Sequence, residues 1–234
     1  MMAKTKTKEQ EGIEILEDPG ALAGKAEEFL NNKKNRNWVL GIGGLVALIT
    51  AGFLGYKYYV SNLNQEAQRE MFQAVYYFEA DSLGKALNGD GINFGFLQII
   101  EDYGATEASN LSHFYVGATY LKMGDYESAI RYLEGFGSSD YLLQARAYSL
   151  IGDAHMELGN FSSASSAYSD AAEYKPNQYF TPVYLQKLAL SEELQGNLKK
   201  AAASYDRIIE DFSGSSMINE AKKQKARLEG LAAE

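Results

Sequence analysis

One stretch, Trp38 to Val60, constrains what this chain can fold into more than any other. Its sequence is WVLGIGGLVALITAGFLGYKYYV, and its first nineteen residues carry no charged side chain. At ~1.5 Å rise per residue, a helix of this length covers the ~30 Å hydrocarbon core of a bilayer. Aromatic side chains stand at both edges, as in many membrane-spanning helices. The alternative is a buried helix of a soluble protein, but such helices are usually shorter. The sequence therefore predicts one transmembrane helix at residues 38–60.

Basic residues flank this stretch unequally. Lys33, Lys34 and Arg36 precede it directly, whereas Lys57 alone lies at its far end. Because cytoplasmic flanks of membrane helices are enriched in Lys and Arg, residues 1–37 are expected in the cytoplasm and the rest across the membrane. A cleaved signal peptide is disfavoured, because the charged leader is long and no small-x-small site follows the apolar run.

Residues 1–37 are expected to form a cytosolic leader with one short amphipathic helix. Met1 to Gln10 is polar and rich in Lys, which predicts disorder. Asp18 followed by Pro19 is typical of an N-cap and a proline at the first helical position. The predicted apolar face of this helix consists of Leu22, Ala26, Phe29 and Leu30. Two interpretations stay open: the helix lies on the lipid surface, or it docks onto the cytosolic part of a partner.

The remaining residues, 61–234, are acidic and numerous enough for one folded domain. They hold fourteen Lys and Arg against twenty-four Asp and Glu, a net charge of −10. This excess argues against a nucleic-acid-binding surface. The chain has no cysteine, which excludes disulfides and thiol chemistry. That composition fits a reducing cytosol and an oxidising bacterial compartment equally well.

Three similar segments recur in this acidic part. They are MGDYESAIRYL from Met123, LGNFSSASSAY from Leu158 and QGNLKKAAASY from Gln195. In each segment the glycine ends one predicted helix, and small residues lie seven positions before it and five after it. Two antiparallel helices joined by a tight turn pack closely where both carry small residues, which explains the pattern physically. The glycines are Gly124, Gly159 and Gly196, the earlier small residues Gly117, Gly152 and Ala189, and the later ones Ala129, Ala164 and Ala201.

This pattern resembles the tetratricopeptide repeat. The second copy is the most complete, with Tyr148, Gly152, Gly159, Phe161, Ala164, Tyr168, Ala171 and Pro176 at the expected offsets. The predicted fold is therefore all-α, with a single N-terminal transmembrane helix followed by a tetratricopeptide-like helical solenoid and a C-terminal capping helix. The predicted parts of the domain at 61–234 are a degenerate helix pair at 61–104, repeats at 110–143, 145–178 and 182–214, and a capping helix at 215–229. Within the degenerate pair, one long helix is expected over Asn62–Ala86.

The sequence offers no support for catalysis. His113 and His155 have no second ligand at a metal-binding spacing. The glycines from Gly41 to Gly44 lie inside the apolar stretch and follow no strand, so they do not form a phosphate loop. We therefore predict a non-enzymatic protein with no catalytic, metal-binding or cofactor-binding residues, and no cofactor.

Helical-repeat domains generally bind through a concave face, which is lined by the first helix of each pair. The predicted partner groove consists of Leu111, Phe114, Ala118, Leu121, Arg146, Ser149, Asp153, Met156, Val183, Gln186 and Leu190. Tetratricopeptide domains that hold the acidic C-termini of chaperones use a basic clamp. The corresponding positions here are Phe114, Ala118, Leu150, Val183 and Lys187. Only one of them is basic, so an acidic tail is rejected as the ligand.

The transmembrane helix carries a possible packing face of its own. Gly43, Ala47, Ala51 and Gly55 are four residues apart and so share one side of the helix. Close packing of two helices in lipid requires small residues in such an arrangement. Glycine is also common in membrane helices without any partner.

The whole layout resembles the YfgM-like family of ancillary subunits of the SecYEG translocon. This resemblance implies a single-pass protein of the bacterial inner membrane, with its N-terminus in the cytoplasm and its repeat domain in the periplasm. It implies as partners the SecYEG translocon, a periplasmic prolyl isomerase or chaperone and nascent secreted polypeptides, besides the lipid bilayer. The implied function is to assist periplasmic chaperone handling of secreted chains. The alternative is a periplasmic scaffold in cell-envelope or outer-membrane assembly.

If the small residues of the span bind a partner helix, Gly43→Leu or Ala47→Leu will detach that partner while membrane insertion stays intact. The larger side chain prevents close approach of the two backbones. Co-purification in mild detergent measures the loss of the partner, and fractionation checks insertion. Unchanged co-purification would contradict the prediction.

Overall fold

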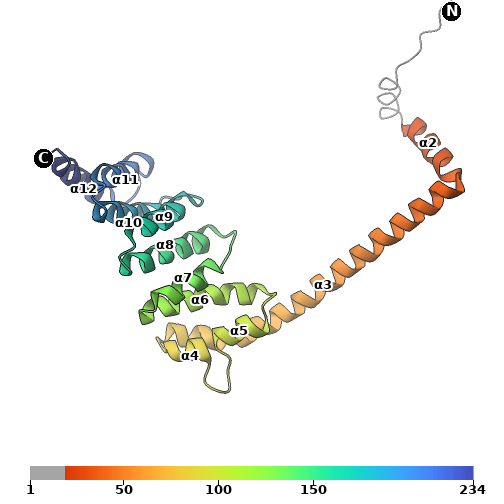
Figure 1. Ribbon diagram of the computed structural model, residues 1–234, viewed down its shortest axis with the longest axis horizontal. Coiled ribbons are helices and arrows are strands. Elements are labelled where there is room, and N and C mark those ends of the chain that lie inside the picture. Colours follow the sequence, from red (N-terminus) through yellow and green to blue (C-terminus); the bar gives the residue numbers. More distant parts are fainter. Residues whose placement is uncertain (1–18, 234) are drawn as a thin grey trace, which may run out of the picture. The chain divides into compact units, whose positions relative to one another are not determined.

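The computed structural model describes residues 19–233, and every regular element in this range is an α-helix (Figure 1). The predicted all-α fold is therefore confirmed for the described part. The expected disorder at the N-terminus and the expected N-cap at Asp18 lie outside the described residues. The chain divides into two compact units, Met1–Tyr59 and Val60–Glu234.

The first unit contains α2 (Pro19–Asn31) and the beginning of α3 (Lys33–Glu79). α2 starts at the proline, as the sequence predicts. Asn32 lies in a bend between the two helices. Its side-chain Oδ1 accepts a hydrogen bond from the backbone N–H of Lys34 at 3.0 Å, so Asn32 caps the new helix. The bend therefore ends one helix and starts the next.

The apolar stretch forms the part of α3 that belongs to this unit. All side chains from Trp38 to Tyr59 are exposed, including Leu48 at 73%. The helix is long and apolar enough to cross a membrane by length and composition. The hydroxyl of Thr50 donates to the backbone carbonyl of Val46 at 2.8 Å, which satisfies its polar group within the helix. These features are compatible with a single-pass membrane anchor.

The second unit begins with the end of α3, followed by α4 (Leu83–Asn88) and α5 (Phe96–Asp102). The expected long helix over Asn62–Ala86 is wrong at its end, because α3 stops at Glu79. Asp81 takes a left-handed conformation with φ of +56°. The N–H of Ser82 then donates to the carbonyl of Tyr77 at 2.8 Å, which closes the helix end. Residues 61–104 thus contain three helical pieces instead of the two of a helix pair.

Three helix pairs and a last helix follow, stacked in chain order (Figure 1). The pairs are α6 (Glu107–Met123) with α7 (Tyr126–Glu134), α8 (Tyr141–Glu157) with α9 (Phe161–Glu173), and α10 (Thr181–Leu194) with α11 (Leu198–Asp211). The last helix is α12 (Ile218–Leu231). Thr106 caps α6, since its Oγ1 accepts a hydrogen bond from the N–H of Ser109 at 3.1 Å. The second unit is therefore a solenoid of antiparallel helix pairs.

The repeated glycines make the turn within each pair. Gly124, Gly159 and Gly196 have φ of +80°, +72° and +78°, a region that side chains with a Cβ rarely adopt. In each turn the residue after the glycine donates its N–H to the carbonyl five positions earlier, as from Asp125 to Tyr120 at 3.0 Å. This arrangement satisfies the last carbonyls of the first helix. The glycine is thus required by the backbone as well as by packing.

The small residues of the repeats lie where the paired helices touch. Ala129, Ala164 and Ala201 are fully buried. A Cβ added at Gly152 would come within 2.5 Å of the Tyr168 ring on α9. Real Cβ contacts are not that short, so only glycine fits beside the tyrosine. The packing expected from the sequence is therefore present.

α12 covers the end of the solenoid. Ala221 and Leu228 are buried against α11, whereas Lys222 and Lys223 are exposed. The guanidinium of Arg227 donates to both carboxylate oxygens of Glu193 on α10, at 2.8 and 2.7 Å. Such two-pronged pairing fixes orientation as well as charge. The predicted capping helix is confirmed.

We expect Gly152→Ala to lower the free energy of unfolding by ~1–3 kcal/mol, because the added methyl group displaces the buried Tyr168 ring. Gly84→Ala is the matched control, since a Cβ at this helical glycine meets nothing within 4 Å. It should be neutral or stabilising by up to ~1 kcal/mol. Denaturant unfolding of the two variants measures both values, and equal effects would contradict close packing at Gly152.

Candidate binding surface

The predicted groove residues lie on α6, α8 and α10, the first helices of the three pairs. We refer to the surface of these helices as the first-helix face. Its predicted members differ in exposure. Arg146, Val183 and Leu190 are exposed, Leu111, Leu121, Asp153, Met156 and Gln186 are half-buried, and Phe114, Ala118 and Ser149 are buried. Whether any of them contacts a partner stays a prediction.

The three buried members cannot present a side chain to a partner, so this part of the predicted groove is corrected. Phe114 is only 7% exposed, and its ring packs 5.4 Å from that of Phe136 between ring centroids. Phe136 belongs to the loop after α7, which is held to the start of α6. There, the side chain of Asn110 donates to the carbonyl of Gly137 at 2.8 Å and accepts from its N–H at 3.0 Å. The loop therefore buries a residue that the helical pattern alone places on the surface.

α10 is the most apolar exposed part of the first-helix face. Val183, Leu190 and Leu194 are 38%, 48% and 49% exposed. They lie four, seven and eleven residues from one another, so they share one side of the helix, and Lys187 lies between Val183 and Leu190 on that side. Tyr179 and Phe180, just before α10, are also exposed. Leu194 and these two aromatic residues were not predicted, although the spacing of Leu194 from Leu190 indicates the same side.

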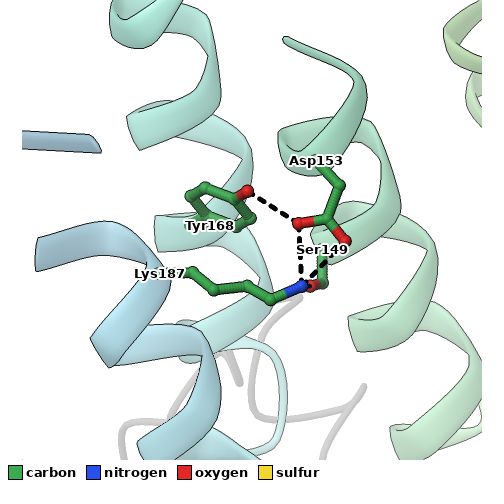
Figure 2. A network of polar contacts seen from close by, with 4 residues as sticks. All are labelled: Ser149, Asp153, Tyr168 and Lys187. Carbon is green, nitrogen blue, oxygen red and sulfur yellow. Dashed lines mark hydrogen bonds and ion pairs between the residues drawn. The ribbon is translucent and has the colours of Figure 1, made fainter. Parts of the chain in front are cut away.

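A polar network joins the second and third pairs across this face (Figure 2). The ammonium of Lys187 on α10 donates to both carboxylate oxygens of Asp153 on α8, each at 2.7 Å. It also lies 3.2 Å from the hydroxyl of Ser149. The hydroxyl of Tyr168 on α9 donates to the same carboxylate at 2.7 Å. Three consecutive helices are thus linked through one aspartate.

This network neutralises one cation of the first-helix face. Lys187 is the single basic residue at the positions of a chaperone-tail clamp, and Asp153 neutralises it. Its three hydrogen-bonding directions are taken by the two carboxylate oxygens and Ser149, and its ammonium lies 5.7 Å from the Tyr168 ring centroid. The sequence indicated Asp153 and Lys187 separately but not their pairing, which depends on the stacking of the two pairs. The face therefore offers no free cation for an acidic tail at this position.

Burial and the hydrogen bond to Asp153 raise the pKa of Tyr168 well above its usual value. Burial likewise is the main cause that raises the pKa of Tyr115, Tyr184 and Tyr205. A neutral phenol is favoured because its charged form would lose hydration in the packed interior. These tyrosines therefore act as neutral packing and hydrogen-bonding groups.

The other predicted surfaces belong to the first unit. Gly43, Ala47, Ala51 and Gly55 lie on α3 and are exposed, and a Cβ at either glycine meets nothing within 4 Å. Ala26, Phe29 and Leu30 are exposed on α2. Leu22 also belongs to α2, but its side chain is outside the described residues. Both faces stay predictions.

Neither histidine has a metal-binding arrangement around it. The Nδ1 atom of His113 lies 3.0 Å from the carbonyl of Ser109, within its own helix. His155 lies on α8, on the side that faces α7 and α9. Within residues 19–233, no group of three or more His, Cys, Asp or Glu side chains could hold a metal ion.

We expect Asp153 and Lys187 to be coupled by ~0.5–1 kcal/mol in a double-mutant cycle with Asp153→Asn and Lys187→Met. The value is modest because both side chains are about one third exposed and water screens the pair. Chemical denaturation of the four proteins measures it. Strict additivity of the two single substitutions would contradict a direct pairing.

The raised tyrosine pKa values predict a loss of stability in alkali. The folded state keeps phenol protons that the unfolded chain releases above its ordinary pKa of 10.0, so stability is full below that pH and falls above it. Melting temperatures measured below and above pH ~10 should therefore fall only above it. Tyr168→Phe removes one such group and should make the decline shallower by up to ~1.4 kcal/mol per pH unit. An unchanged slope would contradict burial of the Tyr168 phenol.

The repeats match a known family. Two overlapping stretches, residues 117–179 and 149–216, match the tetratricopeptide repeat. No curated protein matches the chain. The matched stretches begin within α6 and end before α12, so they include all three glycine turns and the polar network. The match supports tetratricopeptide repeats at residues 117–216, and such repeats generally serve as a scaffold for protein–protein interaction.

Proposed function

We propose that this protein is a non-enzymatic, membrane-anchored accessory of the Sec translocon, which assists periplasmic chaperone handling of secreted chains. The observation that carries the proposal is the first-helix face, which is neutral at Lys187 and exposes Val183, Leu190 and Leu194 on α10. It occurs in the same chain as an apolar helix long enough to span a bilayer.

The charge around the apolar helix supports the proposed direction of insertion. Lys33, Lys34 and Arg36 lie at the start of α3, before the apolar stretch, and all three are exposed. Only Lys57 lies at the far end of the stretch. Retention of the more basic flank in the cytoplasm directs the repeats to the other side of the membrane. In the proposed inner membrane, that side is the periplasm.

The exposed side chains of α10 fit an unfolded chain better than an acidic tail. A chain that has just crossed a membrane exposes apolar segments, which a folded protein buries. Val183, Leu190 and Leu194 offer matching apolar contact, whereas a carboxylate would find the Lys187 ammonium already paired. Contacts with so few side chains are weak individually. The anchor raises the effective concentration of the repeats at the membrane, so weak contacts suffice.

SecYEG and a periplasmic prolyl isomerase or chaperone are proposed as partners from the resemblance of the whole layout. The alternative function is a scaffold in cell-envelope or outer-membrane assembly, in which the same face holds one folded partner. The paired Asp153 and Lys187 favour this alternative, because both side chains are about one third exposed and a polar pair held in one arrangement suits a fixed partner.

Photo-crosslinking separates the two functions. A photoreactive amino acid replaces Leu190 or Met156 on the first-helix face, and Lys200 on α11 serves as the exposed control position. The translocon function predicts many crosslinked secreted chains at the first two positions, which disappear when protein synthesis is stopped. One discrete folded protein, still bound after synthesis stops, would contradict that function and support the scaffold. Equal crosslinking at all three positions would contradict binding by the first-helix face.

A further inference from the structure

We propose that α2 lies on the anionic headgroup surface of the same membrane that α3 crosses. Its apolar face enters the interface, and the basic cluster of Lys33, Lys34 and Arg36 binds the lipid phosphates. The inference rests on the proposed membrane anchor. It states what the apolar face of α2 contacts. Neither the tetratricopeptide repeats nor the proposed partners explain that face.

The apolar face of α2 is exposed to solvent in its own unit. Phe29 and Leu30 are 54% and 40% exposed, and Ala26 lies beside them on the helix. Glu27 and Glu28 occupy the opposite side of the helical wheel. A helix with one apolar and one charged side lies in the plane of a membrane interface. α2 therefore has the side-chain distribution of an interfacial helix.

The position of α2 along the chain brings its last residue to the outer edge of the headgroup layer. Its last residue, Asn31, is seven residues before Trp38, a distance of ~10 Å along a helix. The headgroup layer extends ~5–8 Å beyond the hydrocarbon core on each side. A straight continuation of α3 would carry α2 out of this layer, but the bend capped by Asn32 starts a separate helix there. The break therefore allows α2 to stay at the surface.

The basic cluster supplies the second contribution that such a helix needs. Two large apolar side chains give weak membrane binding alone. Each Lys or Arg near an anionic leaflet favours binding about fivefold, and the three exposed cations together about a hundredfold. Lys33, Lys34 and Arg36 form the first turn of α3, directly after α2. They lie at the depth at which lipid phosphates are available.

Tryptophan fluorescence of the full-length protein in vesicles tests the inference, because Trp38 is the only tryptophan in the chain. The reporter is Phe29→Trp in a Trp38→Phe background, and Glu28→Trp in the same background is the matched control on the opposite side of α2. The vesicles contain phosphatidylglycerol and phosphatidylcholine brominated near the headgroup. We expect the position 29 reporter to be quenched at least about twofold more than the position 28 reporter. The difference should shrink without phosphatidylglycerol, or with Lys33→Gln, Lys34→Gln and Arg36→Gln combined.

Two other outcomes would contradict the inference, and only the second would also contradict the proposed membrane anchor. If Trp38 of the unmodified protein is quenched but neither reporter is, α2 stands away from the lipid while the anchor holds. A cytosolic partner then becomes the explanation of its apolar face. If Trp38 is not quenched by any brominated lipid, α3 does not enter the bilayer, and the membrane-anchored function fails together with the inference.

Discussion

The apolar side chains of α3 impose the constraint on which the rest of the molecule depends. From Trp38 to Tyr59 they are exposed, with Leu48 at 73% and Trp38 at 65%. Each large side chain of this kind gains ~1.5–3 kcal/mol when it leaves water, so the stretch as a whole strongly favours a hydrocarbon environment. A helix can enter hydrocarbon because its backbone hydrogen bonds are internal. In the proposed membrane-anchored protein, the repeats of the second unit stay near the membrane, where weak contacts become useful.

Within the second unit, the stacked helices need glycine for two reasons, one in the backbone and one in the packing of side chains. Glycine is required at three turns because their φ values are positive, and at Gly152 because the Tyr168 ring leaves no room for a Cβ. The same Tyr168 then reaches Asp153, which binds Lys187 from the next pair. Close packing and a polar link between pairs therefore share one residue. The stacking that builds the solenoid also pairs Lys187 with Asp153 on its first-helix face.

Sequence periodicity predicted the features that repeat and missed those that do not. The glycine turns and the buried Ala129, Ala164 and Ala201 follow from a pattern of one helix pair per repeat. The turn at Asp81 was missed, because an aspartate in the left-handed region carries no glycine signal. Phe114 was misplaced because the loop holding Phe136 folds over α6, and loop contacts do not follow the helical period.

The proposed topology is tested by measuring on which side of the membrane the repeats lie. The chain has no cysteine, so single substitutions give clean labels: Ser213→Cys in the turn after α11 and Glu27→Cys on α2. A membrane-impermeant maleimide is applied to cells with a permeable outer membrane and an intact inner one. The proposed topology predicts labelling at position 213 before lysis and at position 27 only after lysis. Labelling at position 27 alone, or at neither position until lysis, would contradict a repeat domain outside the cytoplasm.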